Sequence, residues 1–98
     1  ISWDVRGGLN DGVGEITALG VNQAHRRQGI ARLLVDEVIK DANQVFGSLD
    51  GKLRVLFLFM KGSNETARLF YNSLGFNEVA SIPSFYPNES ASIFIRYF

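Results

Sequence analysis

One segment limits the fold of this 98-residue chain more than any other. Residues 53–60 read Leu-Arg-Val-Leu-Phe-Leu-Phe-Met and are apolar at every position except Arg54. A run of this length that is apolar on both faces is typical of a strand that is covered on both sides of a sheet. We therefore expect a layered domain in which this segment is the central strand.

The residues before this strand predict a hairpin and a helix. Residues 1–6 and 13–21 alternate like two strands around a turn rich in Gly, Asn and Asp. Residues 29–45 repeat apolar side chains at helical spacing and end at Gly47. The predicted apolar stripe of this helix consists of Ile30, Leu33, Leu34, Val38, Ala42 and Val45.

The residues after it predict a second helix and a second hairpin. Ser63 or Asn64 caps a helix that ends at Gly75, and strands from residue 76 and over 92–97 follow. The order is β-β-α-β-α-β-β, an α/β fold with a mixed sheet. The strands before and after the first helix should run parallel, joined by a right-handed crossover.

Composition excludes several classes of function. Ten basic residues balance ten acidic ones, so overall charge favours neither a nucleic acid nor a membrane surface as partner. There is no Cys and a single His, His25, so a disulfide, a thiolate metal site and a cysteine nucleophile are excluded and no metal is expected. No apolar run approaches the roughly 20 residues needed to span a bilayer, and no signal-peptide pattern is present, so we expect a cytoplasmic protein. The length fits a single domain over residues 1–98.

The loop before the first helix carries the tightest cluster of positive charge. Arg26 and Arg27 precede Gly29, and Ala31 follows within the first helical turn. The N–H groups and positive dipole at a helix start bind phosphate, a Gly permits close approach, and the arginines can add charge-assisted hydrogen bonds. In the alternative interpretation, Gly29 only turns the chain and the arginines are solvated.

Two segments resemble a known family. Val-Asn-Gln-Ala-His-Arg-Arg-Gln-Gly-Ile-Ala over residues 21–31 is similar to the acetyl-CoA signature of the GNAT superfamily, Arg/Gln-x-x-Gly-x-Gly/Ala after a strand that ends in Val. About 40 residues later, Asn64, Ala67, Tyr71, Gly75 and Phe76 match the family's second pattern, Asn-x-x-Ala, Tyr and Gly-Phe. The two matches, in this order, cover about residues 13 to 80.

The resemblance implies a GNAT-like acyl-CoA N-acyltransferase fold with acetyl-CoA as cosubstrate. The backbone of Leu19, Gly20 and Val21 would pair with the pantetheine arm in a gap where the two parallel strands splay apart. Asn64 would touch the same arm, although a helix cap explains it equally well. The residues implied in cofactor binding are Leu19, Gly20, Val21, Arg26, Arg27, Gln28, Gly29, Ile30, Ala31, Asn64, Ala67 and Phe70.

Two residues are candidates for catalysis. The resemblance implies that Tyr71 protonates the coenzyme A thiolate as general acid, while the alternative is that Tyr71 belongs to a core stripe with Phe70 and Leu74. Glu15 stands eleven residues before Arg26, an offset similar to that of the glutamate base in the histone acetyltransferase branch. The alternative is that Glu15 is an exposed bystander on a half-buried strand.

The chain departs from the family pattern at its start. A complete member carries a strand, one or two helices and another strand ahead of the position of residue 1. We therefore expect an N-terminally truncated domain whose apolar surface a partner or a homodimer covers. The acceptor amine stays open among a peptide α-amine, a lysine and a polyamine, and Phe85-Tyr86 resembles aromatic residues that line the acceptor site of protein N-terminal acetyltransferases. A non-catalytic acyl-CoA-binding or assembly module is the alternative function.

Overall fold

The structure is a computed structural model that describes residues 1–18 and 28–98. The elements follow the predicted order β-β-α-β-α-β-β. They are β1 (Ser2–Arg6), β2 (Val13–Ala18), α1 (Gln28–Gly47), β3 (Val55–Lys61), α2 (Glu65–Ser73), β4 (Asn77–Tyr86) and β5 (Glu89–Tyr97). Neither helix is long and apolar enough to cross a membrane in the part of the chain that is described.

The strands form one five-stranded sheet in the order β1-β2-β3-β5-β4. Strands β2 and β3 are parallel, as predicted for the segments that flank the first helix, and every other pair is antiparallel. Strand β3 occupies the middle of the sheet, which confirms its prediction as the central strand.

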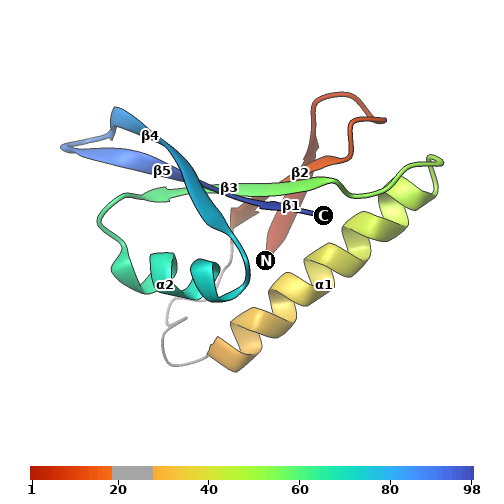
Figure 1. The fold of residues 1–98 in the computed structure, drawn as a ribbon, viewed down its shortest axis with the longest axis horizontal. Coiled ribbons are helices and arrows are strands. Elements are labelled where there is room, and N and C mark those ends of the chain that lie inside the picture. Colours follow the sequence, from red (N-terminus) through yellow and green to blue (C-terminus); the bar gives the residue numbers. More distant parts are fainter. Residues whose placement is uncertain (19–27) are drawn as a thin grey trace.

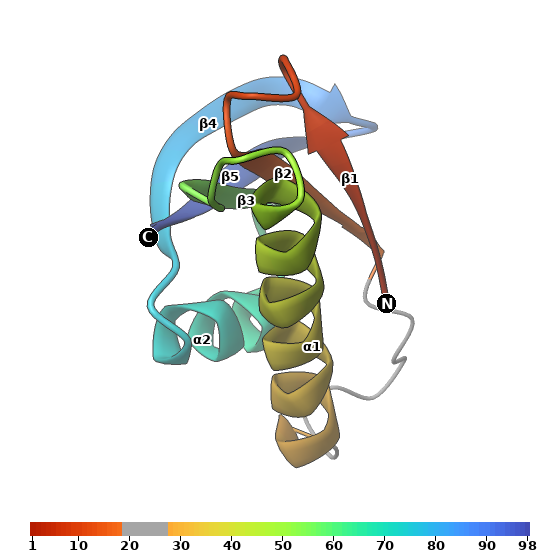
Figure 2. The ribbon, with the colours of Figure 1, turned by 90° about the vertical axis from the view of Figure 1, so that its right-hand side faces the viewer.

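Both helices lie on the same side of the sheet (Figures 1 and 2). Alternate residues of β3, namely Leu56, Leu58 and Met60, point to this side and are buried in the main core with Phe94 of β5. Burying one such side chain contributes about 1.5–3 kcal/mol. The prediction that β3 is covered on both sides is wrong for the described residues. Phe57 and Phe59 lie on the other face and are only half-buried, because no described helix packs there.

The buried stripe of α1 differs from the predicted one. Its buried residues are Ala31, Val35, Val38, Ala42 and Phe46, so the predictions for Val38 and Ala42 hold. Ile30 and Leu33 are 48% and 64% exposed, and the prediction that they face the core is wrong. Apolar side chains cover a wide arc of this helix, so either of two faces could turn toward the core. In the rotation that the structure shows, Ala31 and Ala42 are fully buried, and Phe46 packs beside Trp3 with 6.2 Å between ring centroids.

Helix α2 agrees closely with its prediction. The Asn64 side chain caps it by accepting a hydrogen bond from the Ala67 N–H at 3.0 Å. After the helix, Gly75 has φ +86°, a conformation that a side chain would strain. Phe70 and Tyr71 face the core. The short helix is therefore fixed at both ends and along its apolar face.

Candidate functional site

The pairing between β2 and β3 ends early. Three residue pairs are formed, the last between Glu15 and Phe57, although β2 continues to Ala18 and β3 to Lys61. Beyond this point β2 pairs with β1 and β3 pairs with β5. Beyond these pairs, the backbone groups of β2 and β3 that face each other do not pair. An extended ligand can pair with such groups.

A hollow of about 380 Å³ opens beside this point. Its lining consists of Glu15, Ile16, Thr17, Phe59, Phe85 and Tyr86. Glu15, Thr17 and Phe59 reach it from the face of the sheet opposite the helices, by the alternation of their strands. Phe85 packs against Phe59 with 5.5 Å between ring centroids and meets Tyr86 edge-on at 5.0 Å. The residues that line the hollow therefore supply one carboxylate, the hydroxyls of Thr17 and Tyr86, and an aromatic wall.

Glu15 does not stand alone in this hollow. Its Oε1 accepts a hydrogen bond from Nε of Arg6 at 2.8 Å, and the same guanidinium lies 3.5 Å from the Asp4 carboxylate. The Glu15 side chain is 19% exposed. Arg6 holds one oxygen of the carboxylate in place and would compete for it with an incoming ammonium group.

Arg6 and Phe59 were not predicted as site residues. The signal for Arg6 was present in the hairpin pattern, because Asp4 and Arg6 share one face of β1 and Asp4 pairs directly with Glu15. Phe59 was assigned only to the central strand. Its place in the hollow depends on the contact with Phe85, which lies 26 residues away in sequence and is not readable from local pattern.

Tyr71 lies on the helix side of the sheet and is 5% exposed. Its ring packs edge-on against Phe70 and Phe76. Burial raises the pKa of the Tyr71 hydroxyl to about 12. The phenol therefore keeps its proton at neutral pH. The structure therefore places this side chain in the core, as the alternative interpretation expects, and its role as general acid stays a prediction.

The two motifs of the sequence meet at this core. Ala31 from the start of α1 belongs to the same buried cluster as Phe70 and Tyr71 of α2, and Ala67 packs against that cluster. Glu15 lies on the opposite face, while its neighbour Ile16 is part of the cluster. The structure thus brings together predicted residues from both helices and separates them from Glu15 by the thickness of the sheet.

The start of α1 suits a phosphate among the described residues. A Cβ added at Gly29 would meet no atom of residues 1–18 or 28–98 within 4 Å, so these residues leave space beside its backbone. The first turn carries no acidic residue that would repel an anion. Ile30 is exposed at this end of the helix. Leu19, Gly20, Val21, His25, Arg26 and Arg27 lie outside the described residues, as does any contact that they make.

Residues 3–76 match the model of the acetyltransferase (GNAT) family. The chain belongs to the GNAT family. It is 32% identical over 91 residues to a mycothiol acetyltransferase of Corynebacterium diphtheriae, which covers 91% of this chain and 28% of that protein.

Two solved structures agree with this assignment. The ribosomal-protein-S18-alanine N-acetyltransferase of Escherichia coli has a TM-score of 0.71 and 27% identity, covering 89% of this chain and 55% of that one. NAA60 of Arabidopsis thaliana, solved in complex with acetyl-CoA, has a TM-score of 0.69 and 26% identity, covering 88% and 48%. The chain therefore spans about half of these solved members of the fold and about a quarter of the curated relative.

Proposed function

We propose that this protein transfers an acetyl group from acetyl-CoA to a primary amine. The observation that carries the proposal is the early end of the pairing between β2 and β3. Motif residues of both helices gather on the helix side of the sheet, and Glu15 lies on the opposite side. A thioester lying in that gap would be reachable from both faces. Membership of the GNAT family and the acetyl-CoA complex of a structural relative support the same cosubstrate.

We assign binding to the residues that surround the gap. The first turn of α1, from Gln28 to Ala31, would hold the pyrophosphate with its N–H groups, with Arg26 and Arg27 adding charge. Leu19, Gly20 and Val21 would pair through their backbone with the pantetheine arm. Asn64 already uses its side-chain oxygen as a helix cap, so its amide nitrogen is the part that would meet the arm.

We assign the proton transfers to two side chains. Glu15 would accept the proton of the amine, directly or through water, as the amine attacks the thioester carbonyl. The C–S bond then breaks, and the Tyr71 hydroxyl would donate its proton to the departing thiolate. The raised pKa of Tyr71, about 12, keeps that proton in place at neutral pH.

The hollow supports an amine that carries an apolar neighbour. Phe59, Phe85 and Tyr86 offer aromatic surface beside the Glu15 carboxylate. Among the acceptors open from the sequence, a peptide amino terminus with an apolar first side chain fits this pairing, and the Escherichia coli relative is named for acetylating a protein alanine. A cytoplasmic location and a partner or second copy over the open face remain predictions.

A non-catalytic acyl-CoA-binding module is a second candidate, favoured by one observation. Both catalytic candidates are engaged, since Tyr71 is buried and Glu15 is held by Arg6. Thermal unfolding with coenzyme A, together with thiol release from acetyl-CoA over a panel of amines, separates the two. An enzyme gives both stabilisation and amine-dependent thiol release. A module gives stabilisation alone.

A further inference from the structure

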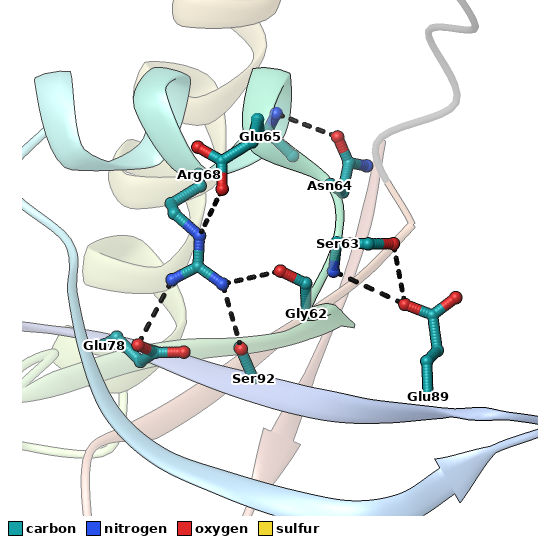
Figure 3. A network of polar contacts seen from close by, with 9 residues as sticks. Gly62, Ser63, Asn64, Glu65, Arg68, Glu78, Glu89 and Ser92 are labelled. Atoms are coloured by element: carbon teal, nitrogen blue, oxygen red, sulfur yellow. Dashed lines mark hydrogen bonds and ion pairs between the residues drawn. The ribbon is translucent and has the colours of Figure 1, made fainter.

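Arg68 links more elements than any other described side chain in Figure 3. It lies on α2, directly after Ala67 and three residues before Tyr71, and its side chain is 22% exposed. Its guanidinium donates to the Gly62 carbonyl at 2.7 Å and to Ser92 Oγ at 3.3 Å, and lies 3.1 Å from Glu78. These partners belong to the turn after β3, to β5 and to β4.

The same turn is held from a second direction. Glu89, at the start of β5, accepts a hydrogen bond from the Ser63 hydroxyl at 2.8 Å (Figure 3). The Gly62 N–H also donates to the Ser90 carbonyl at 3.0 Å. Glu89 pairs across the hairpin with Tyr86, which lines the hollow. The turn that begins α2 is therefore tied to the hairpin that carries the aromatic wall.

The chemistry of this network requires an arginine. A guanidinium presents several donors in a fixed plane and can serve the Gly62 carbonyl, Ser92 and Glu78 at once, which a lysine ammonium on a flexible stem cannot do. Ser92 is buried, so its hydroxyl loses a partner when the guanidinium is removed. The Ser92 hydroxyl and the Arg68 guanidinium lower the pKa of Glu78, so this pair stays charged at neutral pH.

Phe70, Tyr71 and Leu74 bury their side chains where α2 meets the core, and the Arg68 guanidinium also lies 5.4 Å from the centroid of the Phe94 ring. The polar contacts of Arg68 reach the turn at the start of the helix, next to Asn64. We propose that Arg68 is a positioning residue that fixes the turn Gly62–Asn64 against the β4–β5 hairpin and so aligns the coenzyme side of the site with the acceptor hollow. The link to the site rests on the proposed acetyltransferase function.

The test replaces Arg68 with Lys, with Glu65→Gln as control because Glu65 is an exposed partner at 3.6 Å. Amide hydrogen exchange in the free protein is measured first. We expect exchange at Gly62, Ser63 and Ala67 to rise about tenfold in Arg68→Lys and to stay unchanged in the control. Glu89→Gln, which loosens the same turn from the hairpin side, should raise exchange at Ser63 and serves if Arg68→Lys does not fold.

Kinetics then test the link to the site. Well below the unfolding temperature, Arg68→Lys should raise KM for acetyl-CoA about tenfold with a smaller change in kcat. Unchanged exchange overturns the positioning role whatever the activity. Altered exchange with unaltered KM overturns its link to the site. If the wild-type protein neither binds coenzyme A nor releases thiol from acetyl-CoA, both the proposed function and the link of Arg68 to the site are overturned. The exchange result still decides whether Arg68 fixes the turn.

Discussion

The two faces of the sheet differ in what they bury and in what they offer. The helix side holds Tyr71 in a packed core, with Phe94 and Leu56 fully buried. The open side presents Glu15, held by Arg6, in a hollow walled by Phe59 and Phe85. A buried phenol with a raised pKa and a partly exposed carboxylate would suit opposite proton transfers in the proposed reaction. In the proposed reaction the thiolate would therefore leave on the helix side of the sheet, and the amine would approach from the open side.

The largest expected effect is on the free energy of unfolding, and it distinguishes the two faces of the sheet. Phe94→Ala should lower the free energy of unfolding by about 3–5 kcal/mol, because it removes a fully buried ring from the core. Phe85→Ala should lower it by less than about 1 kcal/mol, because that ring is 50% exposed on the open side. Urea unfolding of both variants checks this, and similar losses would contradict the assignment of core and hollow.

A smaller effect concerns alkaline pH and Tyr71. The pKa of this phenol is raised from 10.0 to about 12 in the folded protein, so between about pH 10 and pH 12 the unfolded chain releases its proton first. This contribution to stability is complete below about pH 10 and falls by roughly 3 kcal/mol at most as pH rises through this window. The difference in unfolding free energy between wild type and Tyr71→Phe, followed over the same window, isolates this proton from the other tyrosines and lysines. A difference that stays constant with pH would mean that the phenol is not desolvated.

The smallest effect concerns the open side. Glu15→Gln should lower kcat/KM about tenfold, below the 10²–10⁴-fold typical of a general base, because water can enter the open hollow and take part of the role. The acidic limb of the pH profile should disappear at the same time. Asp4→Asn, which changes the neighbouring carboxylate on the same face, is the matched control. An acidic limb that survives in Glu15→Gln would make this residue a bystander.

Local pattern predicted the elements well because their limits are set locally. The Asn64 cap, the Gly75 stop and the parallel crossover all follow from propensity and turn chemistry. Pattern did not settle the rotation of α1, since Ile30 and Leu33 are as apolar as the residues that the sheet actually contacts. It also led us to expect a packed layer on both faces of β3, because apolar side chains alone do not reveal which part of a protein packs against them.

The site was predictable only in part for a related reason. The resemblance named Ala31, Ala67 and Tyr71 by their spacing, and the structure gathers them in or against one buried cluster, while their roles stay predictions. The Arg6–Glu15 pair and the partners of Arg68 join residues from separate elements. Such contacts depend on strand register and on the arrangement of α2 over the sheet, neither of which is encoded within a short window of sequence.

The measurement that most directly tests the account is the turnover of Tyr71→Phe with acetyl-CoA and an acceptor amine, beside Tyr97→Phe as a control on an exposed tyrosine. We expect kcat to fall at least about 10²-fold in Tyr71→Phe, with coenzyme A affinity and the unfolding free energy at neutral pH nearly unchanged, because only the proton donor is lost. A kcat equal to that of the wild type would contradict the claim that the buried phenol serves the thiolate from the helix side of the sheet.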